Sequence, residues 1–177
     1  MALISIRSLY RYSAVFPALL IAGLAHTALA HDRSHKGGIG IERPYAMATA
    51  PGQAHGVIFV ESIHNDGKEA DQLIGARSPA SATMELHTMV MEAGVMKMRE
   101  ISSIEIPSKA KVSMARGSKE GYHLMLMNLK APLKEGEKVK ATLVFKKAGE
   151  IEITATVRSM KDSGRGGHDK PGHMKHD

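Results

Sequence analysis

The chain has 177 residues, with 24 Lys and Arg against 18 Asp and Glu for a net charge of +6, and it contains no Cys. The absence of Cys excludes disulfides, thiolate zinc sites, iron–sulfur clusters, Cys nucleophiles and blue-copper centres. The basic residues are dispersed and few aromatic residues accompany them, so the charge does not predict nucleic-acid binding. The unusual feature is a high content of 12 Met and 10 His.

The first 30 residues predict a secretory signal peptide. Arg7 and Arg11 give a positive start, an apolar run follows over 14–25, and residues 28–30 (Ala-Leu-Ala) form a small-x-small cleavage pattern. The apolar run is too short to span a bilayer comfortably. We therefore expect cleavage after Ala30, a periplasmic location and no stable membrane insertion of the mature chain. An uncleaved membrane anchor is the alternative interpretation.

The rest of the chain predicts one β domain with polar ends. Residues 31–40 are polar and contain glycine, and they are expected to be flexible, as is the polar tail 161–177. Between them, residues 41–160 contain short β-branched runs separated by turn signals roughly every 8–12 residues, which predicts an all-β sandwich or barrel. The predicted strands are 56–63, 71–76, 84–90, 95–101, 111–115, 123–129, 138–146 and 150–157.

A predicted hairpin brings an imidazole towards a thioether. Residues Met91–Gly94 read as its loop, and if all four are in the loop, His87 lies directly opposite Met98. A two-residue loop at Ala93-Gly94 separates the pair along the strands but keeps both side chains on one face. A three-residue loop places them on opposite faces, because a one-residue slip inverts a strand. Two of the three registers therefore bring His87 and Met98 together.

The segment 123–127 (His-Leu-Met-Leu-Met) offers a second imidazole and thioether. On a strand, His123 and Met125 share one face, and Leu124 and Leu126 share the other. We expect the two Leu side chains to enter the core, and His123 and Met125 to point away from it, towards a rim.

Together, two imidazoles and two thioethers predict a copper site. Thioether sulfur is a soft ligand that selects Cu(I), and imidazole suits copper and zinc. The set has no carboxylate, which disfavours Ca²⁺ and Mg²⁺. The alternative is that the Met side chains are flexible fillers of the core. The candidate ligands are His87, Met98, His123 and Met125.

The same residues carry a resemblance to a known family. The segment 85–98 resembles the signature of the periplasmic copper chaperones of the PCu(A)C type, which is a His, ten residues, a Met, about twenty-one residues and then His-x-Met. Here ten residues separate His87 from Met98, and His123-Leu124-Met125 matches the closing motif. The interval between Met98 and His123 is 24 residues, and the additional residues are expected in the loop 116–121. The resemblance extends from about Pro44 to Val157.

This resemblance implies a cupredoxin-like Greek-key β-sandwich that holds Cu(I) on the four residues and delivers it to the copper centre of a haem–copper oxidase. The implied partner is the copper-accepting subunit of a respiratory oxidase or another copper chaperone. Two alternatives remain at this point: a copper-resistance protein that sequesters the metal, and a β-sandwich adhesion or assembly module without metal. No Ser/His/Asp arrangement or carboxylate pair predicts an enzyme.

The C-terminal tail predicts a second, looser copper site. Flexible His-rich segments bind metal readily, and imidazole without thiolate suits Cu(II). A simple solvated terminus is the alternative. The candidate tail ligands are His168, His173, Met174 and His176.

Overall fold

The computed structural model describes residues 33–160, so the predicted signal peptide and the predicted copper ligands of the tail lie outside the described residues. Within this range, every segment of regular secondary structure longer than one residue is a β-strand. The strands are β1 (Arg33–Lys36), β2 (Ile39–Met47), β3 (Gly56–Asn65), β4 (Asp71–Arg77), β5 (Ser81–Glu92), β6 (Val95–Glu100), β7 (Ile104–Ile106), β8 (Lys111–Met114), β9 (His123–Leu129), β10 (Lys138–Phe145) and β11 (Gly149–Arg158).

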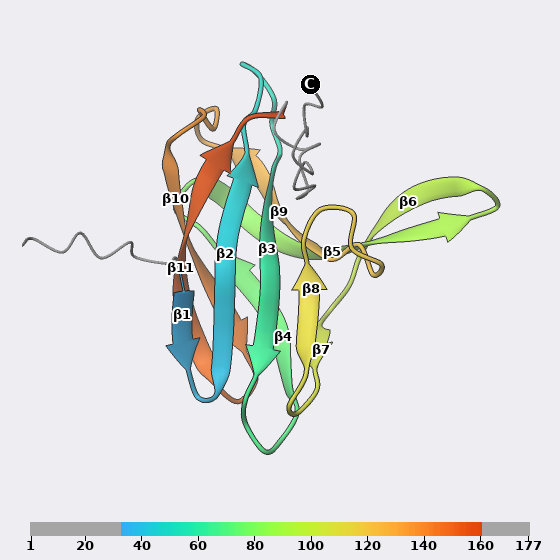
Figure 1. Cartoon of the computed structure of the whole chain (residues 1–177). Coiled ribbons are helices and arrows are strands. Elements are labelled where there is room, and N and C mark those ends of the chain that lie inside the picture. Colours follow the sequence, from blue (N-terminus) through green and yellow to red (C-terminus); the bar gives the residue numbers. More distant parts are fainter. Residues whose placement is uncertain (1–32, 161–177) are drawn as a thin grey trace, which may run out of the picture.

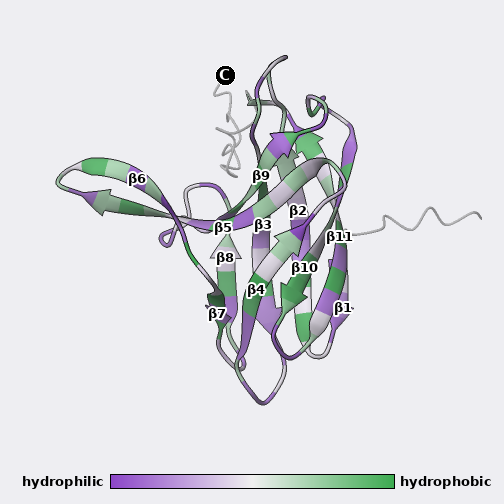
Figure 2. Ribbon diagram, turned by 180° about the vertical axis from the view of Figure 1, so that it is seen from behind, coloured by the Kyte–Doolittle hydropathy of each residue, from purple (hydrophilic) through white to green (hydrophobic). Residues whose placement is uncertain are grey.

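The strands wrap around one core as two layers. Strands β2, β3 and β8 lie in one layer, and β4, β5 and β10 lie behind them (Figures 1 and 2). Hydrogen bonds connect the strands in the order β6-β5-β9-β3-β2-β11-β10-β4-β7, with β1 on β2 and β8 on β3. In the described part of the chain, β11 pairs with β2 in parallel and the other pairs are antiparallel. The all-β prediction is confirmed.

Alternation of apolar and polar residues places the core between the layers. In β10 and β11, every second residue is buried, and the intervening residues are mostly charged or hydroxylic. Removing each such Leu, Ile or Phe side chain from water contributes about 1.5–3 kcal/mol. The buried residues of these two strands are Val139, Ala141, Leu143, Phe145, Ile151, Ile153, Ala155 and Val157.

The N-terminal part of the domain differs from the sequence prediction. Residues 31–40 were expected to be flexible, but residues 33–36 form β1, and β2 begins at Ile39. Gly37 and Gly38 have φ angles of 58° and 83°. Positive φ at both central residues is the geometry of a tight hairpin turn, which only glycine adopts without strain. The two glycines therefore join two paired strands, although in the sequence they suggested a flexible segment.

A buried carboxylate fixes the turn between β10 and β11. Asp71 is only 5% exposed. Its oxygens accept hydrogen bonds from the backbone N–H groups of Gln72, Lys147 and Ala148, at 2.7, 2.9 and 2.9 Å. Two of these donors belong to the β10–β11 turn, so Asp71 connects that turn to the start of β4.

Replacing Asp71 should destabilise the domain. In Asp71→Ala, the three donors lose their acceptor in a partly buried position, so the free energy of unfolding should fall by about 1–3 kcal/mol. Urea unfolding measures this change. Glu135→Ala, at an exposed acidic residue, is the control and should stay within about 0.5 kcal/mol of the wild type. Equal effects of the two substitutions would contradict this role of Asp71.

Candidate metal centre

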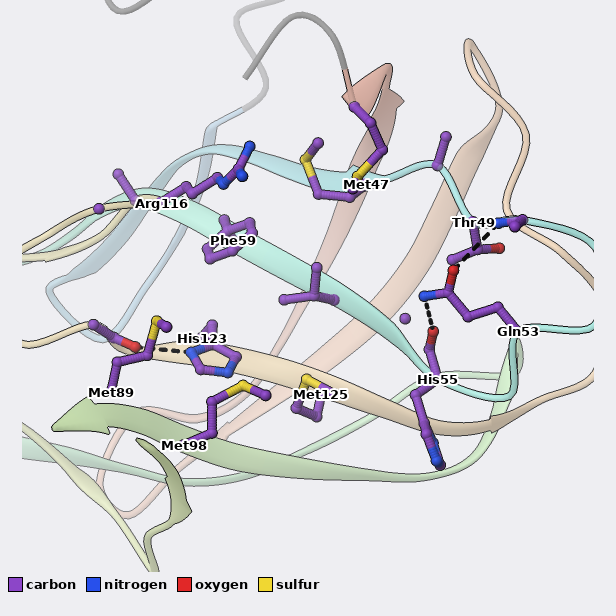
Figure 3. Close-up of a pocket in the computed structure, with 18 residues that line it drawn as sticks. Met47, Thr49, Gln53, His55, Phe59, Met89, Met98, Arg116, His123 and Met125 are labelled. Atoms are coloured by element: carbon purple, nitrogen blue, oxygen red, sulfur yellow. Dashed lines mark hydrogen bonds between the residues drawn. The ribbon is translucent and has the colours of Figure 1, made fainter. Parts of the chain in front are cut away.

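A hollow of about 460 Å³ lies at the end of the sandwich where β3 begins and is walled mainly by apolar side chains. Three of the four predicted copper ligands line it: Met98 from β6, and His123 and Met125 from β9. Figure 3 shows these three side chains grouped together, with Phe59 beyond them. The structure thus brings together residues that are up to 27 positions apart in the sequence.

Strand β9 positions His123 and Met125 as its alternation predicts. Leu124 and Leu126 have no exposed surface and belong to the core, while Met125 is partly buried on the opposite face. His123 differs from the expectation of a rim position, because it is only 3% exposed. Phe59 covers it, with the two ring centres 6.0 Å apart.

The hydrogen bond of His123 determines which ring nitrogen is free. Nδ1 of His123 lies 2.8 Å from the carbonyl oxygen of Gly121, so this nitrogen carries the proton and donates it. Nε2 therefore keeps a lone pair. Burial lowers the pKa of His123 below its usual 6.5, the nearby His87 lowers it further, and the Gly121 bond opposes both effects. At neutral pH the ring is uncharged and able to bind a metal.

His87 lies directly beside His123 but does not line the hollow. The two residues are partners in the β5–β9 ladder, and their ring centres are 5.7 Å apart. When two imidazoles bind one ion, each ring centre lies on the order of 3.2 Å from the metal, so the centres can be up to about 6.4 Å apart. The observed separation fits a shared ion.

A carboxylate that the sequence analysis did not assign contacts His87. Nε2 of His87 lies 2.9 Å from Oε2 of Glu85, two residues earlier on the same face of β5. Its other nitrogen, Nδ1, is buried and has no hydrogen-bond partner among the described residues. A carboxylate that accepts the N–H of a metal-binding His orients the ring and makes it a better donor. Glu85 is in the position for this role, and its i, i+2 spacing from His87 was visible in the sequence.

The hairpin adopts the register with the shorter loop. Ala93 and Gly94 form a two-residue turn, with φ angles of 49° and 78°, and Glu92 pairs with Val95. Met98 consequently lies opposite Met89, and His87 lies opposite Glu100. Two of the predicted registers keep His87 and Met98 on one face. The observed register is the one of these two that separates the pair along the strands.

The outer part of this hairpin, residues 88–99, projects from the sandwich, and we call it the arm (Figure 1). All six residues of β6 are exposed. Cross-strand pairs and strand alternation place four thioethers on one face of the arm. On the other face, Glu92 forms ion pairs with Lys97 and Arg99. The four Met residues and their exposures are Met89 37%, Met91 64%, Met96 56% and Met98 58%.

Met89 is a lining residue of the hollow that the sequence analysis did not assign. Its position two residues after His87 placed it on the same strand face, which was the available signal. The high exposure of Met98 excludes the alternative that this side chain fills the core. The four donors that the sequence predicted are uncharged when both imidazoles are neutral, which suits a soft monovalent ion.

The geometry is that of a β-sandwich with His and Met side chains grouped at one end, and solved structures share this fold. The copper-bound PCuAC domain of PmoF2 shares 28% identity and a TM-score of 0.60, over 72% of this chain and 97% of that one. The Cu(I) form of DR1885 from Deinococcus radiodurans shares 28% identity and a TM-score of 0.52, over 66% and 75%. The fold is therefore that of PCuAC domains, which are cupredoxin-like.

The family described as "Putative lipoprotein LpqE-like" matches residues 39–157, and the chain belongs to this family of PCuAC copper chaperones. A protein of Leifsonia xyli described as "Putative lipoprotein Lxx21020" is 32% identical over 120 residues, which cover 67% of this chain and 70% of the relative. The family is non-catalytic, in agreement with the prediction that the chain is not an enzyme. Residues 33–160 contain no helix of the length and apolarity needed to cross a membrane.

The depressed pKa of His123 should make metal-free stability depend on pH. The unfolded chain takes up a proton on His123 as pH falls through about 6.5, whereas the folded chain does so only at lower pH. His123→Asn retains a side-chain N–H and removes this titration. We expect the wild type to lose stability relative to this variant as pH falls from about 7.5 to 5.5. Urea unfolding at several pH values measures the difference, and parallel curves would contradict it.

Proposed function

We propose that this protein carries one Cu(I) ion outside the cytoplasm, in the periplasm, and delivers it to the copper centre of a haem–copper oxidase. The proposed ligands are His87, Met98, His123 and Met125. The observation that carries the proposal is the meeting of Met98, Met125 and the uncharged ring of His123 in one hollow. Its acceptor is the copper-binding subunit of a respiratory oxidase or another copper chaperone.

The donor set favours reduced copper. Thioethers bind Cu(I) well and bind hard or oxidised cations weakly. Met98 and Met125 need lose no proton before binding, and the lowered pKa of His123 means that protons compete weakly for its ring. The unpaired Nδ1 of His87 also fits a site that gains a ligand, because a buried nitrogen without a partner is otherwise unfavourable.

The exposure of the ligands favours transfer over sequestration. His123 is buried at 3% exposure, whereas Met98 is 58% exposed on the arm. An acceptor's ligand can replace the Met98 thioether first, while His123 still holds the ion. A protein that sequesters copper would instead need its ligands closed off from partners.

Relatives support the metal and the location. The PmoF2 domain is described as copper-bound, and DR1885 as its Cu(I) form. Relatives described as lipoproteins and the export signal expected in residues 1–30 both support a location outside the cytoplasm. We retain the expectation that the tail binds Cu(II) through His168, His173, Met174 and His176 as a separate proposal.

Replacing Met98 should weaken Cu(I) binding without unfolding the protein. Met98→Ile is similar in volume and exposed, so the free energy of unfolding should change by less than about 1.5 kcal/mol. Cu(I) affinity, measured by competition with a chromophoric Cu(I) chelator, should fall at least about tenfold, or about 1.4 kcal/mol.

Met96→Ile is the matched control for this experiment. Met96 lies on the same face of the arm with nearly the same exposure, 56%, but nearer to the tip. It should bind Cu(I) as the wild type does. Equal loss in both variants would mean that the arm collects copper through any exposed thioether. No loss in either would overturn the proposed ligand set.

A further inference from the structure

A second group of metal-binding side chains lies at the opposite end of the sandwich. Strand β3 starts at Gly56, which lines the hollow, and runs to Asn65 at the far end. There, one potential ligand atom from each of His35, His64 and Asp66 lies within 4.8 Å of the others. None of these residues belongs to the copper site proposed above.

The strand registers bring the two imidazoles together. His35 of β1 is the partner of Gly40 in β2, and Gly40 is the partner of His64 in β3. The three residues therefore form one row across three strands, with glycine in the middle. The two rings meet edge to face above it, with their centres 5.0 Å apart.

Gly40 leaves the space that the two rings occupy. A Cβ at this position would lie 2.1 Å from Nε2 of His64 and 2.4 Å from Cε1 of His35. The φ angle of Gly40 lies outside the left-handed region, so the backbone does not require glycine here. Glycine is therefore needed at position 40 because a larger residue would leave no room for the two imidazoles.

Asp66 adds an oxygen donor at suitable range. Its Oδ2 lies 3.6 Å from Nε2 of His64. Two ligand atoms on a tetrahedral ion with bonds of about 2.0–2.1 Å lie about 3.3 Å apart, so a small rotation of the carboxylate completes the fit. The Asp66 side chain is 71% exposed, which leaves room for this rotation.

The backbone beneath the group is held firmly. The N–H of Asp66 donates to the carbonyl oxygen of Gly38 at 2.8 Å, which ties the β3–β4 loop to the β1–β2 turn. Asn65 is buried, accepts from the N–H of Gly67 at 2.9 Å and donates to the carbonyl oxygen of Glu69 at 2.8 Å. The elements that carry the three side chains are thus fixed relative to one another, as metal ligands require.

We propose that His35, His64 and Asp66 bind a divalent transition-metal ion of the Cu(II) or Zn(II) type. Two imidazoles and a carboxylate form a nitrogen and oxygen donor set that suits these ions, and the absence of thioether makes it a poor site for Cu(I). Three ligands leave coordination positions for water. The site is chemically distinct from the proposed Cu(I) site and does not depend on it.

Two lysines border the site and are already engaged. Lys109 donates to the carbonyl oxygen of Asp66 at 2.6 Å, and Lys111 donates to Glu42 at 3.2 Å. Their charges oppose a cation, while the carboxylate of Asp66 attracts it. We therefore expect moderate affinity that falls when Asp66 loses its charge.

The test is a Zn(II) titration of the ¹⁵N-labelled chain without its predicted signal peptide (residues 31–177). NMR monitors the titration at individual amides. We expect shifts at Gly40, His64 and Gly67 that reach saturation at one equivalent for this cluster. Ligands in the tail would be observed separately, through their own resonances. Shifts restricted to other parts of the chain would overturn the proposal.

Two variants assign the ligands. Asp66→Asn changes an exposed side chain, so folding should be retained, and His64→Asn removes an imidazole. Each should lower the Zn(II) affinity at these amides at least about tenfold, equivalent to about 1.4 kcal/mol. Unchanged affinity in Asp66→Asn, with a wild-type spectrum of the metal-free protein, would remove Asp66 from the site and overturn the three-residue proposal.

Met98→Ile is the control for independence. It should leave Zn(II) binding at this cluster unchanged, and Asp66→Asn should leave Cu(I) affinity unchanged. If Met98→Ile binds Cu(I) normally, the proposed Cu(I) ligand set fails while the second site stands. If Asp66→Asn lowers Cu(I) affinity as well, the two sites are not separate and the inference of a distinct divalent site is wrong.

Discussion

The alternation of side chains along β9 is the constraint on which both the fold and the hollow depend. Leu124 and Leu126 have no exposed surface and anchor the strand in the core. Their position forces His123 and Met125 onto the other face, where they meet the arm. A slip of one residue would expose two leucines and bury the wrong side chains, so core packing maintains the register of the proposed metal donors.

The loop before β9 connects this strand to the arm. Gly121 accepts the hydrogen bond from His123, and its φ angle is 60°. A Cβ at Gly121 would lie 2.6 Å from Cβ of Met89, so only glycine allows the loop to approach the arm this closely. The carbonyl oxygen of Glu120 accepts a hydrogen bond from Thr88 on the arm. The same short segment thus determines the tautomer of His123 and holds the arm where it leaves the sandwich.

Sequence alone predicted the eight strands with β-branched, alternating residues, because a strand buried on one face alternates apolar and polar side chains. It missed three strands. Strand β1 is short and polar, Gly40 and Pro44 interrupt the run of β2, and β7 has only three residues. It left the register of the arm open, because the two-residue loop requires a positive φ at Ala93. Alanine rarely adopts a positive φ, so the sequence does not predict this turn.

The site was predicted in part for similar reasons. His123 and Met125 follow from strand alternation, which is local. The depth of His123 depends on Phe59 of another strand, and the contact of His87 with Glu85 depends on side-chain rotation. The Phe59 contact leaves no periodic signal in the sequence, and the i, i+2 spacing of Glu85 and His87 indicates a shared strand face but not their contact. The row of His35, Gly40 and His64 spans three strands. The sequence analysis missed β1 and β2, and its predicted range for β3, 56–63, stops before His64.

The exposure of β6 has a consequence for how tightly an ion could be held. Among residues 33–160, β5 is the one strand that is hydrogen-bonded to β6, so the arm should open locally at a small free-energy cost compared with the core. An ion shared by Met98 and β9 would close the polypeptide between them into a ring and reduce that motion. The entropy lost in stiffening the arm would subtract from affinity. A more flexible arm would then bind the ion less tightly and release it to an acceptor faster, with no change in any ligand.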